Sequence, residues 1–377
     1  MHAADVLRGL RAVIDGAGAP LFLGDAGGAV GGDAGRLPAP PGTAVVVTTS
    51  GSSGYPKSVV LSRSALIAST TATAERLGEG RWLLALPATY IAGVQVLVRS
   101  LMAGHEPALL SGSFSAEAFA ALAATMHSRV GDVDVPVYTS LVPAQLQTLL
   151  DAADAGIRTH LDTFAAVLVG GQALAPALAE RAAASGVRIV RTYGSSETAG
   201  GCVYDGVPLR GATLRIVDGE VQVSGPMLAD GYLGEPERTA DVFIRDDDGT
   251  RWYRTGDAGT LDGGVLRVTG RRDNVIVSGG VNVSLDRVEQ AVRTLAGLET
   301  AVVVPVTDER WGQGSVVVLD EAARRGDPDV LERIRAAVGA QLGAPARPRG
   351  ILAVDEVPLL PSGKPDRAAL ARRVADA

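Results

Sequence analysis

Only two lysines occur in the chain, and each lies in a loop of small or rigid residues. Lys57 belongs to "TTSGSSGYPKS" (48–58) and Lys364 to "LLPSGKPD" (359–366); the 35 basic side chains less these two leave 33 arginines. A lysine ammonium is a compact point charge that fits between two oxygens where the planar arginine fork does not. We therefore predict that both lysines contact oxygen-rich groups. The alternative interpretation of each is a solvated surface lysine.

The first loop has the composition of a phosphate-binding loop. It follows the apolar run "AVVV" (44–47) and precedes a helical stretch that begins near Ser62–Ser64. A glycine- and serine-rich turn between a strand and a helix exposes N–H groups and hydroxyls, which suit phosphate oxygens. The loop is not a Walker A motif, because it lacks a contiguous Gly-Lys-Ser/Thr.

Composition limits the classes of function. The chain has 377 residues and a formal net charge of −7, without a basic run, so nucleic acid is not an expected partner. No apolar run approaches the roughly 18 residues of a membrane span. The single cysteine, Cys202, excludes an intramolecular disulfide and a cysteine-cluster metal site. We predict a cytoplasmic enzyme large enough for two or three domains.

Apolar runs of strand length alternate with alanine- and leucine-rich helical stretches in the first part of the chain. The runs at 164–170 and 187–194 resemble the one at 44–47. This alternation predicts an α/β fold with largely parallel strands. Shorter segments follow, broken by glycine and aspartate, and predict hairpins with turns at 218–219 and 262–264.

A smaller α+β unit is predicted beyond residue 272. Ser284 can cap a helix whose apolar residues share a face, namely Leu285, Val288, Val292 and Leu295. Strands at 301–306 and 315–319, and helices near 329–342 and 366–375, complete this unit. We place the boundary at 272–273, with an ATP- and acyl-binding domain at 1–272 and a small domain at 273–377.

Five motifs occur in a fixed order from residue 48 to residue 367. They are "TTSGSSGYPKS", "YGSSETAGG" (193–201), "YRTGDAG" (253–259), "GRRDNVIVSGGVNVS" (270–284) and "LPSGKPDR" (360–367). This set resembles the signature of the acyl-adenylate-forming superfamily, which includes acyl-CoA synthetases, adenylation domains of peptide synthetases, and luciferases. Within it, "LPATYIAGVQVLV" (86–98) and "YTSLVPAQLQTLL" (138–150) resemble the o-succinylbenzoate–CoA ligases of menaquinone synthesis.

The resemblance implies a two-step reaction with ATP, Mg²⁺ and coenzyme A. A substrate carboxylate attacks the α-phosphate of ATP, which releases pyrophosphate and leaves an acyl-adenylate, and a thiol then displaces AMP. Lys364, Lys57 and Glu197 would be catalytic, and Glu197 would hold Mg²⁺ through its carboxylate. The remaining ATP and AMP contacts would come from Thr49, Ser50, Ser52, Ser53, Gly54, Gly170, Gly171, Gln172, Tyr193, Gly194, Ser195, Ser196, Asp257 and Arg271.

The resemblance also implies a swinging small domain. Asp273 matches the position about which the domain turns between the two half-reactions. In one orientation Lys364 is in the site. In the other, Ser278, Gly279 and Gly280 replace it and line the approach of the thiol.

The acid itself is expected near Tyr90 and Ser140. Tyr90 occupies the position at which many relatives have histidine. Only about 47 residues precede the phosphate loop, fewer than in the relatives, so we expect most of their first subdomain to be missing. A second substrate carboxylate would be held within 86–95, 139–145 or 195–202. No arginine lies in these segments, so neutral donors or water are expected there.

Three alternatives to an o-succinylbenzoate–CoA ligase stay open. The chain could be another aryl- or acyl-CoA ligase, or a stand-alone adenylation enzyme that loads a carrier protein. It could also be a relative that binds an acyl-adenylate without turnover, although such a protein would not need Lys57, Glu197, Asp257 and Lys364 together. The expected partners are small molecules, and the oligomeric state, a homodimer included, stays open.

Overall fold

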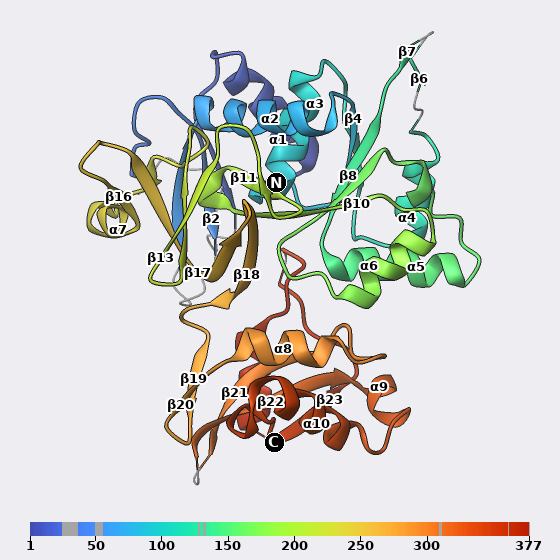
Figure 1. Cartoon of the computed structure of the whole chain (residues 1–377). Coiled ribbons are helices and arrows are strands. Elements are labelled where there is room, and N and C mark those ends of the chain that lie inside the picture. Colours follow the sequence, from blue (N-terminus) through green and yellow to red (C-terminus); the bar gives the residue numbers. More distant parts are fainter. Residues whose placement is uncertain are drawn as a thin grey trace.

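The computed structural model describes residues 1–24, 37–49, 56–126, 129–130, 133–308, 311–360 and 362–376. Figure 1 shows a larger region, coloured blue to yellow, above a smaller orange and red region. A loop of the smaller region reaches up to the larger one. The predicted α/β fold with a small C-terminal α+β domain is confirmed. The boundary at 272–273 stays a prediction.

A seven-stranded sheet forms the middle of the larger region. Its order is β12-β11-β10-β9-β8-β4-β5, and the five strands from β10 to β5 are parallel. The strands are β4 (Arg81–Leu84), β5 (Ala108–Leu109), β8 (Val137–Leu141), β9 (Ala166–Val169), β10 (Ile189–Ser195), β11 (Gly200–Tyr204) and β12 (Val207–Pro208). The predicted parallel strands are therefore present, and β11 and β12 add an antiparallel edge.

Helices cover both faces of this sheet. They are α2 (Arg63–Leu77) and α3 (Ile91–Met102) on one face, and α4 (Ala116–Ala123), α5 (Pro143–Asp154) and α6 (Pro176–Ala184) on the other. Successive strand residues point to opposite faces. Accordingly, Trp82 and Leu84 belong to the core beneath α2 and α3, whereas Leu83 belongs to the core beneath α4–α6. Both faces are apolar, as in a doubly covered parallel sheet.

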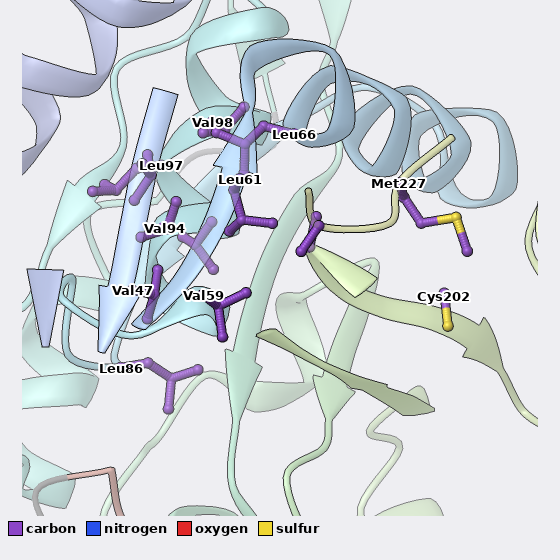
Figure 2. Close-up of a cluster of buried hydrophobic side chains, with 14 of the residues drawn as sticks. Val47, Val59, Leu61, Leu66, Leu86, Val94, Leu97, Val98, Cys202 and Met227 are labelled. Carbon is purple, nitrogen blue, oxygen red and sulfur yellow. The ribbon is translucent and has the colours of Figure 1, made fainter. Parts of the chain in front are cut away.

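The first core also holds Cys202. Figure 2 shows its thiol beyond a group of valine and leucine side chains from strands and helices of the larger region. Burial raises the pKa of this thiol to about 12. A buried thiol that stays protonated behaves as a small apolar filler.

A second sheet carries the first lysine. Its order is β1-β2-β3-β15, with β1 (Leu21–Gly24), β2 (Thr43–Thr49), β3 (Lys57–Ser62) and β15 (Gly231–Tyr232). The prediction of a direct strand-to-helix turn is wrong, because β3 pairs antiparallel with β2 and places Lys57 opposite Thr49. Only three apolar residues, 59–61, mark β3, too few for a distinct strand signal. Ser62 does cap α2, and α1 (Ala3–Ile14) packs nearby.

A third sheet contains the two predicted hairpins. It consists of β13 (Thr213–Val217), β14 (Glu220–Ser224), β16 (Phe243–Arg245), β17 (Arg251–Asp262) and β18 (Val265–Arg271), beside α7 (Pro236–Val242). Asp218 and Gly219 connect β13 to β14, both with positive φ, at 50° and 75°. Gly263 and Gly264 connect β17 to β18, with φ of 55° and 81°. Both turn predictions are confirmed.

The smaller region is one sheet with helices. Its elements are β19 (Val275–Ser278), β20 (Val281–Ser284), β21 (Val302–Asp308), β22 (Gly312–Asp320), β23 (Gly350–Val354), α8 (Leu285–Arg293), α9 (Glu321–Arg325), α10 (Val330–Leu342) and α11 (Arg367–Ala375). Ser284 caps α8 as predicted, by accepting a hydrogen bond from the Arg287 N–H at 3.4 Å. The sequence pattern did not predict β23, which pairs parallel with β22.

Candidate active site

The motif residues of the larger region gather where parallel strands end. Ser140 lies near the end of β8, Gly170 and Gly171 follow β9, and Ser195 ends β10. The carboxyl ends of parallel strands are the usual place for a ligand in an α/β sheet. Gly170 has to be glycine, since a Cβ there would lie 2.2 Å from Thr192 Oγ1.

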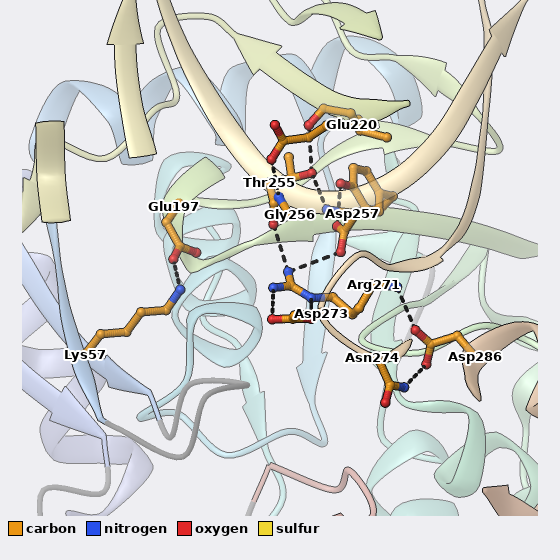
Figure 3. A network of polar contacts seen from close by, with 12 residues as sticks. Lys57, Glu197, Glu220, Thr255, Gly256, Asp257, Arg271, Asp273, Asn274 and Asp286 are labelled. Carbon is orange, nitrogen blue, oxygen red and sulfur yellow. Dashed lines mark hydrogen bonds and ion pairs between the residues drawn. The ribbon is translucent and has the colours of Figure 1, made fainter. Parts of the chain in front are cut away.

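Lys57 pairs with Glu197 across 140 residues of sequence (Figure 3). The side chain of Lys57 is 21 % exposed and that of Glu197 is 3 % exposed, so neither is the solvated surface residue of the alternative interpretation. The Tyr232 hydroxyl donates a second hydrogen bond to Glu197 at 2.9 Å. The pair therefore lies at the end of the β2–β3 ladder, where Lys57 is opposite Thr49.

The environment of Glu197 favours its charged form. Burial raises the pKa of the carboxyl, but the charge and hydrogen bond of Lys57 and the Tyr232 hydroxyl more than offset this, so the pKa is lowered overall. A short 3₁₀ helix, Ser196–Thr198, presents Glu197 and ends at Ala199, whose φ is 48°. A non-glycine residue in this region is uncommon and implies that its surroundings hold the backbone. The Ser69 hydroxyl does so by donating to the Ala199 carbonyl at 3.0 Å.

Asp257 forms a second polar centre. Its Oδ2 accepts a hydrogen bond from the Tyr193 hydroxyl at 2.7 Å, and its Oδ1 accepts from Arg271 Nη1 at 3.2 Å. Burial raises the pKa of Asp257, while the Tyr193 and Arg271 contacts oppose that shift. An ionised carboxylate can accept two hydroxyl donors at once, so this carboxylate could hold a diol such as a ribose.

Glu220 supports this centre from behind. Its side chain is 6 % exposed, accepts from the Gly256 N–H at 3.1 Å, and pairs with Arg254 at 3.1 Å and Arg272 at 3.4 Å. The Arg272 N–H in turn donates to the Gly256 carbonyl at 2.9 Å. These contacts form a closed ring that fixes the irregular pairing at Gly256 in β17, next to Asp257. Glu220 was not predicted, because in the alternating run 220–224 it falls on the face opposite the valines.

Arg271 connects Asp257 to the predicted hinge. Its Nε and Nη2 donate to the two oxygens of Asp273 at 3.0 and 2.9 Å, and its Nη1 donates to the Thr255 carbonyl at 2.8 Å. A two-point pair of this kind fixes orientation as well as distance. Asp273 lies between β18 and β19, where the larger region gives way to the smaller one.

Lys364 reaches this site from the smaller region. A Cβ added to Gly171 would lie 3.5 Å from Lys364 Cε, and one added to Gly363 would lie 3.1 Å from Val142 Cγ2. The loop is closed by the Leu360 N–H, which donates to the Lys364 carbonyl at 2.7 Å. Lys364 is exposed to solvent, yet the dense protein around it lowers the pKa of its ammonium by desolvation, against the charges of Asp257 and Glu197.

Among the described residues of the site, two hydroxyls are buried without a hydrogen-bond partner. They are Thr49 Oγ1, at the end of β2, and Ser195 Oγ. Buried polar atoms are normally satisfied, so these two mark places where a ligand would supply the partner. Ser50, Ser52, Ser53 and Gly54 lie outside the described residues. Gln172 follows Gly171 after β9, Gly194 precedes Ser195 in β10, and Ser196 begins the 3₁₀ helix that follows.

Comparison with known proteins explains this gathering of residues. A model of the AMP-binding enzyme family matches residues 12–261, and a model of the AMP-binding enzyme C-terminal domain matches residues 287–364. The chain belongs to the AMP-binding enzymes. The resemblance to the acyl-adenylate-forming superfamily is thereby confirmed, and with it an AMP-forming ligase.

Three relatives illustrate the likeness. A probable 2-succinylbenzoate–CoA ligase of Mycobacterium tuberculosis is 42 % identical over an alignment of 341 residues that covers 88 % of this chain and 85 % of the relative. The o-succinylbenzoate CoA synthetase of Bacillus subtilis, solved with its acyl-adenylate intermediate, is 26 % identical with a TM-score of 0.70, over 87 % of this chain and 69 % of that one. The amide bond synthetase McbA of Marinactinospora thermotolerans is 26 % identical with a TM-score of 0.76, over 99 % and 83 %.

The predicted thiol-approach segment of this AMP-binding enzyme lies away from the site. Ser278 is fully buried in the smaller region, and Gly279 packs so tightly on Trp311 that a Cβ would lie 2.4 Å from its ring. β19 runs away from the larger region, so the turn at 279–280 lies at its far end (Figure 1). In this orientation the structure brings Lys364 to Lys57, Glu197 and Asp257, and it does not bring Ser278, Gly279 or Gly280.

Among the buried polar side chains of helix α3, Gln95 lies within the predicted segment 86–95 and Arg99 lies outside the predicted segments. Tyr90 precedes α3, and Gln95 and Arg99 follow one turn apart on one face of that helix. A Cβ on Gly200 would lie 3.1 Å from Gln95 Cγ, so Gln95 packs behind the loop that carries Glu197. Gln95 Nε2 and Arg99 Nε are both buried without a hydrogen-bond partner.

Arg99 is a buried cation. It is 6 % exposed, donates to the Tyr204 hydroxyl at 3.2 Å and lies over the Trp82 ring. No carboxylate of the described residues forms an ion pair with it, and burial lowers its pKa. It lines a cavity of about 250 Å³ between α2 and α3. An arginine inside an otherwise apolar helix was the signal in the sequence.

No helix in the described part of the chain is long and apolar enough to cross a membrane. No group of three or more histidine, cysteine, aspartate or glutamate side chains lies together in that same part of the chain.

Proposed function

We propose that the chain activates 2-succinylbenzoate with ATP and transfers the acyl group to coenzyme A. The observation that carries this proposal is the convergence of Lys57, Glu197, Asp257 and Lys364, from both regions, on one site. The 42 % identical relative supports the choice of acid. The alignment with that relative covers 88 % of this chain, so the similarity extends over both the larger and the smaller region.

The first half-reaction joins two anions. A carboxylate oxygen of the acid attacks the α-phosphorus of ATP, a C–O–P linkage forms, and the bond to the pyrophosphate oxygen breaks. Positive charge and N–H donors must offset the growing negative charge, and loss of one such donor costs about 10²–10³ in rate. Lys57 and Lys364 are the two ammonium groups that face this site.

Mg²⁺ fits the donors that are present. A site with one carboxylate and few other protein ligands suits Mg²⁺, which keeps waters and substrate phosphates in its shell. Glu197 is the carboxylate we propose for it, beside the unpartnered Ser195 hydroxyl. When bound, the ion would neutralise phosphate charge. Lys57, released from Glu197, would then turn to the phosphates.

Asp257 and Arg271 are proposed to hold the ribose of ATP. Asp257 accepts two donors already, from Tyr193 and Arg271. A ribose diol can take the place of these donors without moving the carboxylate. Glycines 170 and 171, with Gln172, would lie along the adenine, as the family pattern implies.

Gln95 is proposed to hold the second carboxylate of the acid, as one of the neutral donors expected within 86–95. Its Nε2 is buried without a hydrogen-bond partner among the described residues, and its side chain packs behind the Glu197 loop. A buried donor of this kind is satisfied when a carboxylate oxygen accepts its hydrogen bond. Tyr90 and Ser140 would contact the rest of the acid.

The second half-reaction requires the smaller region to turn about Asp273. A thiolate of coenzyme A attacks the acyl carbon, a C–S bond forms, and the bond to the AMP oxygen breaks. Ser278, Gly279 and Gly280 are proposed to replace Lys364 for this step. The small-molecule partners ATP and coenzyme A favour a cytoplasmic location, and a homodimer is the oligomeric state to test first.

One assay tests the proposal. A panel of carboxylic acids is incubated with ATP, and AMP release is measured with coenzyme A, with a simple amine, and with neither. We expect 2-succinylbenzoate to be the best acid and coenzyme A to be required for turnover. Better turnover of long-chain fatty acids would refute the choice of acid. Turnover with an amine in place of coenzyme A would favour an amide synthetase. The amide bond synthetase McbA aligns with 99 % of this chain, which makes this the alternative to test.

The same assay tests the acid site. Gln95→Ala should raise the KM for 2-succinylbenzoate about tenfold, since it removes a hydrogen-bond donor to a buried carboxylate, and should leave the KM for ATP unchanged. Benzoylpropionate, which lacks the second carboxylate, should not distinguish the variant from the wild type. An equal KM for 2-succinylbenzoate in both proteins would refute this assignment.

A further inference from the structure

The connection between the two regions is fixed by a carboxylate that none of the five motifs assigns to catalysis. Asp286 lies in the first turn of α8, in the smaller region. Its Oδ2 accepts a hydrogen bond from the backbone N–H of Arg271 at 2.6 Å, and its Oδ1 accepts from Asn274 Nδ2 at 2.7 Å (Figure 3). These two contacts lie on opposite sides of Asp273.

The contact with Asn274 stays within the smaller region. The Leu285 N–H, at the start of α8, donates to the Asn274 carbonyl at 3.0 Å, and β19 begins at the next residue. Asn274, β19 and α8 therefore form one unit with Asp286. A rotation about Asp273 would move them together and would leave this hydrogen bond intact.

The contact with Arg271 crosses the connection. Arg271 ends β18 and is held in the larger region by Thr255 and Asp257. A rotation about Asp273 would separate its N–H from Asp286. The hydrogen bond therefore exists in the present orientation and is lost in another.

The packing beside this bond is equally specific to the orientation. Gly270 has a φ of 141°, and a Cβ there would lie 2.6 Å from Asp286 Cβ. Glycine lets the end of β18 lie directly against the first turn of α8. Gly270, which precedes the donor Arg271, and Asp286, the acceptor, thus form a close contact between the two regions.

We infer that Asp286 is a positioning residue that stabilises the orientation in which Lys364 reaches the nucleotide. This inference rests on the proposed two-step function. A hydrogen bond that is present in only one of two orientations favours that orientation. Its loss should change the ratio of the two orientations about tenfold or more, as expected for a bond to a charged acceptor.

Half-reaction rates test the inference. In single-turnover experiments with ATP, 2-succinylbenzoate and coenzyme A, Asp286→Ala should lower the ratio of adenylation rate to thioester-forming rate about tenfold. Asn274→Ala, which removes the contact within the smaller region, should leave that ratio unchanged. Equal slowing of both steps by Asp286→Ala, or an equal effect of Asn274→Ala, would overturn the inference.

A second measurement needs no substrate and separates this inference from the proposed function. Cys202 is the only cysteine of the sequence and is buried, so two introduced cysteines can carry a fluorophore pair. Arg158, in the larger region, and Arg325, in the smaller one, are exposed, with side-chain exposures of 64 % and 79 %. Energy transfer in the doubly labelled protein reports the orientation.

Wild type should give one narrow distance distribution, and Asp286→Ala a broader or shifted one. Asp286→Asn keeps one acceptor oxygen and should give an intermediate result, which remains informative if the alanine variant unfolds. Identical distributions in the wild type and the asparagine variant would overturn the role of Asp286. A shifted distribution with no turnover of 2-succinylbenzoate by the wild type would instead refute the choice of substrate.

Discussion

Lys57 is held by contacts within the larger region, whereas Lys364 is brought to the same site by a loop of the smaller region. Lys57 pairs with a carboxylate that is almost fully buried, and that carboxylate also accepts a tyrosine hydroxyl. Lys364 is exposed, and its loop is closed mainly by its own backbone hydrogen bonds. One half of the site is fixed by packing and the other half depends on the orientation of the smaller region.

This difference gives each half a different task. A group fixed by packing can act in every step in which its ligand is bound. A group carried by a moving domain acts only in the step for which that domain is in place. Lys57, Glu197 and Asp257 would therefore act whenever nucleotide is bound. Lys364 would act in adenylation alone and leave before the thiol arrives.

The largest expected effect comes from removing the carried charge. Lys364→Ala should slow adenylation by about 10²–10³ while thioester formation from supplied acyl-adenylate stays within a few-fold of the wild type. Single-turnover measurement of each half-reaction checks this. Lys364→Arg serves as the matched control and should also be slow, because a planar fork does not replace a point charge. Equal loss in both half-reactions would show that Lys364 is not a carried group.

A smaller effect is expected at the connection between the two halves. Asp273→Pro fixes φ near −65° and should slow thioester formation about ten- to hundredfold, the range given by one strained backbone conformation. Adenylation and the melting temperature should stay near wild type. Asp273→Ala is the control, because it removes the Arg271 ion pair and keeps the backbone free. If both variants have the same rates, residue 273 is not the point of rotation.

A still smaller effect is expected from weakening the fixed half. Glu220→Gln keeps an acceptor for the Gly256 N–H but removes the charge that faces Arg254 and Arg272. ATP affinity, measured by calorimetry, should fall about tenfold, while affinity for the acid and the ratio of the two half-reactions should not change. Glu237→Gln, at an exposed position, is the control. A change in the ratio of half-reactions would contradict the separation of the two halves.

The sequence predicts the residues that carry the chemistry better than those that support them. Lys57, Glu197 and Asp257 lie in short motifs whose composition is visible locally. Glu220 contacts the backbone of Gly256, 36 residues away, and Arg99 contacts a tyrosine 105 residues away. The apolar helix around Arg99 marks it as unusual, but the partners of both side chains are set by the fold and are not visible in any local pattern.

Strand prediction failed for a related reason. β3 has only three apolar residues between Lys57 and Ser62, and its pairing with β2 and β15 supplies what its own sequence lacks. β23 is likewise completed by its neighbour β22. In contrast, the turn at Asp218 and Gly219 was predictable, because positive φ at two successive residues requires a local type of sequence.

The smallest expected effect concerns the two carboxylates of the fixed half, whose pKa values shift in opposite directions. The pKa of Glu197 is lowered from its ordinary 4.5 by Lys57 and Tyr232, against burial. Its contribution to folding stability is therefore fully present above pH 4.5, and it is lost as the pH falls through the lower pKa of the folded protein. The pKa of Asp257 is raised by burial, from an ordinary 3.8. Its charged form therefore opposes folding, and this cost grows as the pH rises through that range.

Melting temperatures of Glu197→Gln and Asp257→Asn should reveal these opposite signs. At pH 7, Glu197→Gln should melt below the wild type, and the difference should shrink near pH 4. Asp257→Asn should not melt below the wild type at pH 7, because it removes a carboxylate whose charge is unfavourable. A contribution of about 1 kcal/mol moves the melting temperature of a large domain by about 2–4 °C, which scanning calorimetry resolves. If Glu197→Gln has the same melting temperature as the wild type at pH 7, Lys57 does not stabilise the charged carboxylate. Packing within the larger region would then not be sufficient to fix this half of the site.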